Sequence, residues 1–100
     1  MAEVIWSESA LADIDELAEF IARDSKVYAD QMVTEIFERA AVLERFPKVG
    51  KKVPERNDPT YRELQVPPFR ILYKVEEGKV TILAAIHARR NARKVIGKLK

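Results

Sequence analysis

The sequence predicts an α+β fold: a short N-terminal strand, an antiparallel two-helix hairpin packed on one face of an antiparallel sheet, and a basic C-terminal tail. Two observations lead to this prediction. The spacing of apolar residues is helical up to about Gly50 and alternates like that of strands beyond it. The charge changes in the same region, because residues 1–46 carry −7 (4 basic, 11 acidic) and residues 47–100 carry +9 (14 basic, 5 acidic). One hundred residues, 47% of them hydrophobic, suit a single domain spanning 1–100.

The N-terminal half is predicted to form one strand and two helices. Residues 4–6 are apolar strand formers, and Ser7 suits the start of a helix. Apolar residues at helical spacing indicate a first helix that ends near Arg23 and a second over residues 29–46, stopped by Pro47. The connection between the helices is short, so they are expected to pack antiparallel.

The C-terminal half is predicted to form the sheet. Residues 51–60 are rich in turn formers and are expected to be a loop, whereas residues 61–66, 69–76 and 79–87 alternate like strands. Paired prolines separate the first two strands, and Glu77 with Gly78 forms a tight hairpin turn between the last two. The tail from Arg89 onward is basic and is either a short helix or a disordered end, with Val95, Ile96 and Leu99 as candidate anchors.

A hairpin closed by a two-residue turn fixes which side chains share a face of the sheet. The face expected to lie under the helices is apolar and carries Phe69, Ile71, Tyr73, Val75, Val80, Ile82, Ala84 and Ile86. The opposite face is expected to be open. If the turn at residues 67–68 is tight, Gln65 pairs with Arg70, and Glu63 joins this open face while Leu64 and Val66 join the core.

The predicted open face gathers polar side chains that could act on an anion. They are Glu63, Gln65, Arg70, Lys74, His87 and Arg89. Phosphodiester cleavage needs a base, an acid and cations near the developing charge, and this set contains all three kinds of group. The alternative interpretation is a set of cross-strand ion pairs on a solvated face.

Other kinds of site are not expected. With no cysteine and one histidine, the chain offers neither a disulfide nor a usual zinc centre. Its three serines lie before residue 26, which argues against a serine triad, and its three glycines form no phosphate loop. We therefore expect no metal and no cofactor. The sequence also lacks a secretory signal and a membrane-spanning stretch, so a soluble cytoplasmic protein is predicted.

Four motifs follow one another after the predicted strand and helix: LERFPKVG at 43–50, YREL at 61–64, FRILY at 69–73 and IHARR at 86–90. Their ordered combination resembles the RelE/ParE superfamily of toxins from bacterial type II toxin–antitoxin systems. The resemblance covers nearly the whole chain. It implies an intracellular growth-arresting toxin that a small antitoxin neutralises in a hetero-oligomer.

The superfamily has two activities. RelE-like members cut messenger RNA on the ribosome, and ParE-like members poison DNA gyrase. The resemblance to the RelE type implies that Arg70 contacts the scissile phosphate and that Arg89 assists. His87 is a third catalytic candidate because of its place on the predicted open face, where it or Glu63 could substitute for the base and acid of that type. That type also uses two lysines on the preceding strand, where this chain has Arg62 and Leu64, and a tyrosine or histidine near the C-terminus, where this tail has neither.

Two features resemble the ParE-like branch more closely, namely the long helical hairpin and the IHARR ending of the last strand. Gyrase inhibition is therefore favoured, and the protein would then be a binding inhibitor and not an enzyme. The candidate residues for binding a partner or nucleic acid are Arg62, Glu63, Arg70, Arg89, Arg90, Arg93 and Lys94. A non-toxic relative that only binds an antitoxin or DNA is a third interpretation.

Overall fold

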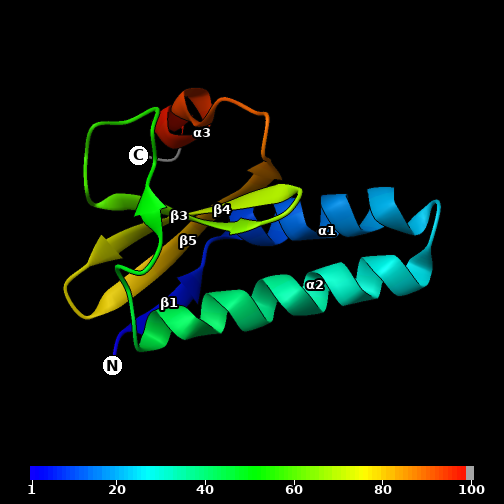
Figure 1. The fold of residues 1–100 in the computed structure, drawn as a ribbon, viewed down its shortest axis with the longest axis horizontal. Coiled ribbons are helices and arrows are strands. Elements are labelled where there is room, and N and C mark those ends of the chain that lie inside the picture. Colours follow the sequence, from blue (N-terminus) through cyan, green and yellow to red (C-terminus); the bar gives the residue numbers. More distant parts are fainter. Residues whose placement is uncertain (99–100) are drawn as a thin grey trace.

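The computed structural model describes residues 1–98. Its elements in chain order are β1 (Glu3–Trp6), α1 (Glu8–Ala22), α2 (Lys26–Ala41), the 3₁₀ helix η1 (Val42–Glu44), β2 (Lys51–Lys52), β3 (Tyr61–Val66), β4 (Phe69–Glu76), β5 (Lys79–His87) and α3 (Ala92–Lys98). The strands form one sheet in the order β1-β5-β4-β3-β2. Figure 1 shows α2 on one side of this sheet and α3 on the other.

The predicted helical hairpin is confirmed. Ser7 and Ser25 cap the two helices, since their side chains accept hydrogen bonds from the backbone N–H groups of Ala10 and Tyr28. The second helix ends earlier than predicted. The α-helix α2 ends at Ala41, and the 3₁₀ helix η1 follows it directly, so the α-helix does not reach residue 46.

The edges of the sheet differ from the prediction. The strand β2 lies in the segment that was expected to be a loop, and β1 pairs with β5 in parallel, although an antiparallel sheet was expected. A parallel neighbour requires a crossover connection, and the helical hairpin supplies it. The predicted tight turns on either side of β4 are both confirmed, and Gln65 pairs with Arg70. The turn between β3 and β4 contains a cis peptide bond between Pro67 and Pro68. In the turn between β4 and β5, Gly78 has a φ angle of 76°.

A β-bulge changes the predicted register of the β4–β5 hairpin. Near the turn Tyr73 pairs with Ile82 as predicted, but Leu72 then pairs with Ala84, which leaves Leu83 as an extra residue. The bulge is fixed from α1 and its cap, because the Ser7 hydroxyl donates to the Leu83 carbonyl at 3.3 Å and Asp13 accepts from the Ala85 N–H at 3.0 Å. The predicted placement of Ala84 and Ile86 under the helices is therefore wrong.

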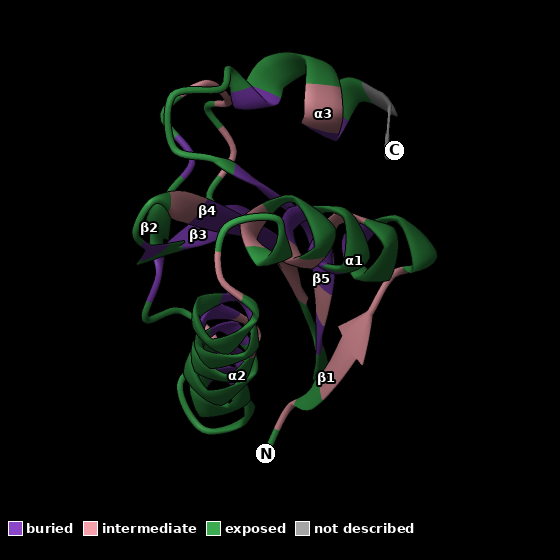
Figure 2. Cartoon of the chain, turned by 90° about the vertical axis from the view of Figure 1, so that its right-hand side faces the viewer, coloured by how far each residue is buried: buried purple, intermediate pink, exposed green. Residues whose placement is uncertain are grey.

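The sheet is covered on both faces. The first core joins α1 and α2 to the face that carries Leu64, Val66, Ile71, Tyr73, Val80, Ile82 and Ala85, so the predicted burial of Leu64 and Val66 is confirmed. The second core lies on the other face and consists of Val53, Tyr61, Leu72, Leu83, Ala84, Ile86, Ala92 and Ile96. The face that was predicted to be open is therefore packed against the loop before β3 and against α3, and Figure 2 shows buried residues on the inner side of α3.

The C-terminal tail takes the helical alternative. Ile96 is buried and Val95 packs beside it, which confirms both as anchors, whereas Leu99 lies outside the described residues. Within residues 1–98, the helices are too short or too polar to cross a lipid bilayer.

Candidate functional site

Arg70 is the centre of a buried ion-pair network on the second face of the sheet. It lies on β4, is 5% exposed and donates from Nε and Nη2 to the Glu63 carboxylate at 3.3 and 2.5 Å. Nη1 and Nη2 donate to the two carboxylate oxygens of Glu55 at 2.8 Å each, and Nη1 also donates to the Arg90 carbonyl oxygen at 2.8 Å. These five contacts equal the five N–H groups of a guanidinium, so the donors of Arg70 are fully engaged.

The network balances its own charge. Glu63 is 2% exposed and lies between Arg70 and Lys51, whose Nζ is 3.9 Å from its carboxylate. Hydrogen bonding to Arg70 lowers the pKa of Glu55 from 4.5 to about 2, and hydrogen bonding to Glu55 and then to Glu63 raises the pKa of Arg70. Arg70 and Lys51 therefore lie against the two carboxylates of Glu55 and Glu63, so each acidic side chain has a basic partner.

Sequence reasoning missed Glu55. It lies in the segment between β2 and β3, which folds back over the sheet because Val53 is buried in the second core. Besides Arg70, its carboxylate accepts the backbone N–H of Ala92 at the start of α3, at 3.0 Å. One sequence signal could have indicated a further acidic partner. An arginine within an apolar strand needs carboxylates to pair with when it is buried, and the predicted strand pairing placed only Glu63 near Arg70.

The predicted open polar surface is not formed. Glu63 and Arg70 are buried, and the bulge pairs His87 with Phe69, whose side chain packs against the first core. His87 is exposed, and its Nδ1 accepts the Arg89 N–H at 3.2 Å. The prediction that His87 shares a face with Arg70 is therefore wrong, because one extra residue in β5 moves its side chain to the other face.

Arg62, a candidate binding residue, holds the chain's own backbone. Its Nη1 donates to the carbonyl oxygens of Gly50 and Lys48 at 2.9 and 3.3 Å. The same turn is fixed from the core, because the Gly50 N–H donates to the Tyr73 hydroxyl at 2.9 Å, and a Cβ at Gly50 would lie 2.5 Å from the Glu63 carbonyl oxygen. Arg62 thus joins this turn to β3.

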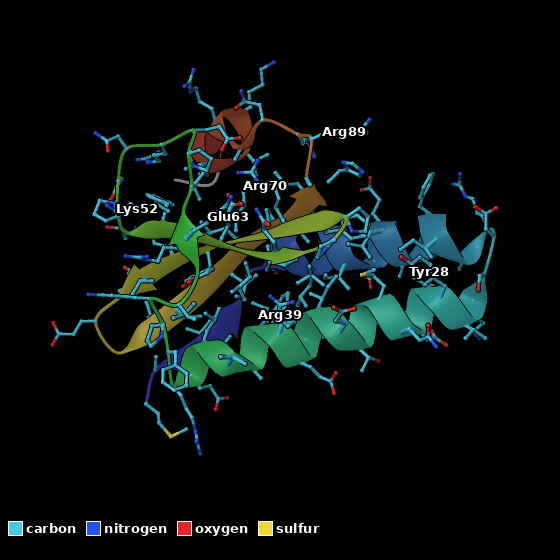
Figure 3. The ribbon with its side chains drawn as sticks, in the orientation of Figure 1. Tyr28, Arg39, Lys52, Glu63, Arg70 and Arg89 are labelled. Carbon is cyan, nitrogen blue, oxygen red and sulfur yellow. The ribbon has the colours of Figure 1, made fainter. Side chains whose placement is uncertain are left out.

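The remaining predicted cations form an exposed basic segment, which consists of Arg89, Arg90, Arg93 and Lys94. This basic segment runs from the end of β5 into α3, and Figure 3 shows Arg89 on that connection while Arg70 lies between the sheet and α3. Internal contacts shape it: Ala88 N–H donates to the Pro68 carbonyl at 2.8 Å, and Arg90 N–H donates to the His87 carbonyl at 2.9 Å.

A cavity of about 620 Å³ lies between α1 and the end of β5. Its apolar lining includes Leu17, Phe20, Phe69 and Ala85. The charged rim on the side of α1 is mostly acidic, with Asp13, Glu16 and Glu19 beside Arg23, whereas the rim at the end of β5 carries His87 and Arg90. A groove with an apolar floor and charged rims suits an amphipathic segment of another protein.

Residues 1–98 contain no group of three or more His, Cys, Asp or Glu side chains placed to hold a metal ion. The features of the described surface that bear on the predicted site residues are the basic segment and the groove, together with the ion-pair network beneath the segment.

Residues 4–92 match the model of a protein family described as ParE toxin of type II toxin-antitoxin system, parDE. The chain belongs to this ParE toxin family. Membership confirms the superfamily that the ordered motifs indicated, and it makes the chain a toxin of the type II toxin–antitoxin class.

Individual relatives come from both branches of the superfamily. The chain is 35% identical over 91 residues to a protein named Toxin RelE2 from Caulobacter vibrioides, covering 90% of this chain and 99% of that one. Its fold is similar to that of a chain in a chromosomal ParDE system from P. aeruginosa, with TM-score 0.74, 23% identity and 89% and 98% of the two chains covered. Free RelE from E. coli, as a mutant, is also similar, with TM-score 0.67, 17% identity and coverage of 99% and 95%. These structures confirm the α+β fold.

Proposed function

We propose that this ParE-family toxin arrests growth by binding and inhibiting DNA gyrase and that a cognate antitoxin neutralises it. The observation that carries the proposal is the engagement of Arg70. In the RelE-like activity this arginine would meet a phosphate, yet here its donors are taken by Glu55, Glu63 and the Arg90 carbonyl. A binding inhibitor needs no such phosphate contact.

Separation of the other catalytic candidates supports the same proposal. A cleavage site needs its acid, base and cations within hydrogen-bond reach of one phosphodiester. Here His87 lies on the helix-covered side, whereas Arg70 lies beneath α3. The basic segment instead presents its four cations outward, where they suit an acidic protein surface or the DNA that gyrase holds.

The test compares the two activities in parallel. Purified toxin is added to a gyrase supercoiling and DNA-cleavage assay and, at the same concentrations, to a translating extract in which messenger RNA is followed. We expect loss of supercoiling with intact messenger RNA. Unchanged gyrase activity at a large molar excess of toxin would refute the proposal.

Ribosome-dependent cleavage of messenger RNA is the second candidate. The relative named Toxin RelE2 favours it, because it is 35% identical to this chain over nearly the full length of both. Cleavage of messenger RNA in the extract, with unaffected supercoiling, would select this candidate. It would also mean that the Arg70 network opens on the ribosome.

The groove between α1 and β5 is the proposed docking place for the antitoxin. A flexible amphipathic segment gains by burying its apolar face there and by matching the charged rims. The measurement is the affinity of the neighbouring gene product for wild-type toxin and for Phe20→Glu, which puts a charge into the groove at an exposed position. An unchanged affinity would exclude the groove.

A further inference from the structure

The four cations of the basic segment are carried by a short piece of chain that cannot hold its own shape. The helix α3 has seven residues and contains Gly97. Isolated helices shorter than roughly 12 residues are marginal in water, and a glycine weakens them further. Packing of Ala92 and Ile96 on the second core supplies some of the missing stability.

The charges of α3 also oppose helix formation. Its first turn contains Arg93 and Lys94 and no acidic residue. Cations at the start of a helix are unfavourable because they face the positive end of the helix dipole. Asn91 offers a partial cap, since its Oδ1 accepts the Arg93 N–H at 2.8 Å.

Glu55, from the segment between β2 and β3, provides the negative charge that the first turn of α3 lacks. Its carboxylate accepts the Ala92 N–H at 3.0 Å, which places a negative charge at the first residue of α3. The same carboxylate is held by two 2.8 Å hydrogen bonds from Arg70, so its position is fixed by the sheet. The sheet therefore determines where the helix begins.

Arg70 makes a second connection to the same stretch. Its Nη1 donates to the carbonyl oxygen of Arg90, two residues before the Ala92 N–H that Glu55 binds. The backbone is thus held at two points, one on each side of Asn91. Arg70 binds the carbonyl before it directly, and Glu55 binds the amide after it. Arg90 carries the first of these points and Arg93 follows the second, so the backbone positions of both arginines depend on the two contacts.

We propose that Glu55 and Arg70 are positioning residues that hold the basic segment in the geometry with which it meets the toxin's target. They act through the Arg90 carbonyl and the Ala92 amide and do not themselves touch the target. This inference rests on the proposed function for its target, gyrase, but the hold on the segment is a property of the chain alone.

The test uses Glu55→Gln in the full chain, with Glu77→Gln as the matched control. Both substitutions remove one negative charge, but Glu77 lies exposed in the β4–β5 turn and makes no ion pair among the described residues. Three quantities are measured for each protein: amide hydrogen exchange of residues 92–97, inhibition of gyrase, and affinity for the antitoxin.

We expect faster exchange in residues 92–97 of Glu55→Gln, with exchange in β3, β4 and β5 unchanged. If the ordered state of the segment falls to about a tenth of the population, the inhibitory concentration against gyrase rises about tenfold. Antitoxin affinity should fall much less, because Arg90 is the one residue of the basic segment that lines the proposed groove, whose other lining lies on α1, α2, β4, β5 and the β3–β4 turn. The control should match wild type in all three quantities.

Several outcomes would overturn the inference. Unchanged exchange in residues 92–97 would mean that Glu55 does not hold the segment. Faster exchange with unchanged gyrase inhibition would remove the positioning role, and an equal loss of gyrase and antitoxin binding would indicate general destabilisation. If wild-type toxin leaves gyrase unaffected, the proposed function fails, while the exchange measurement still decides whether the network holds the segment.

Discussion

The two faces of the sheet are covered in different ways. On the first face two capped helices of 15 and 16 residues bury a large apolar core, which includes Ile36 and Tyr73 without exposure. On the second face a loop and a seven-residue helix cover a smaller core, at whose edge lies the network of Arg70, Glu55 and Glu63. The first cover is stable through apolar burial. The second depends on a few polar contacts that single substitutions or acid can remove, and the candidate target-binding cations lie on it.

The largest effect is expected from Arg70→Ala, which removes the centre of the second cover. Glu63 would then be buried with its main partner gone, and leaving a buried charge unpaired costs about 4 kcal/mol. Chemical unfolding of the purified protein measures this loss. Because the substitution destabilises the fold, loss of toxicity in this variant would not identify Arg70 as a catalytic residue. A loss below about 1 kcal/mol would show that the network contributes little.

A pair of isoleucines compares the two cores directly. Ile36 on α2 is 0% exposed and Ile96 on α3 is 1% exposed, so each is fully packed. We expect Ile36→Ala to lower the global free energy of unfolding by about 3 kcal/mol, as usual for a core cavity. Ile96→Ala should mainly speed hydrogen exchange within α3. Equal global losses from the two variants would mean that both covers unfold as one unit.

Acid should destabilise the second cover before the first, and the expected loss of stability is smaller than that from the substitutions above. The pKa of Glu55 is about 2 in the fold against 4.5 ordinarily, because Arg70 donates to it, and Glu63 and Lys51 complete the surrounding charges. A lowered carboxyl pKa contributes stability that is fully present above pH 4.5 and is lost as the pH falls towards 2. We expect wild type to lose about 2 kcal/mol more than Glu55→Gln over this interval.

Urea unfolding at a series of pH values measures this difference. Glu77→Gln serves as the control and should follow wild type, because its carboxylate lies outside the network. Parallel curves for wild type and Glu55→Gln between pH 4.5 and 2 would contradict the assigned role of Glu55.

Most of the secondary structure could be predicted from the sequence because its signals are local. Helical spacing, the serine caps and the two turns around β4 lie within a few residues of the elements that they define. The family also followed from ordered local motifs. The predicted first core was largely correct for the same reason, since strand alternation and helical periodicity each select one face.

The candidate site was predicted less well, because its contacts join distant segments. Glu55 and Arg70 are 15 residues apart and Glu55 and Ala92 are 37 apart, so no local pattern connects them. The misplacement of His87 has one cause, the extra residue Leu83 in β5. That bulge is fixed by Ser7 and Asp13, more than 70 residues earlier in the chain.

The sequence by itself determined the elements, the helix-covered face and the division of charge between the two halves, because each is a property of neighbouring residues. Only the tertiary structure decided that the second face is closed, that Arg70 is paired inside the protein and that, among the predicted binding cations, the exposed ones are those of residues 89–94. The physical reason is that a buried guanidinium must be satisfied by whichever carboxylates the fold brings to it.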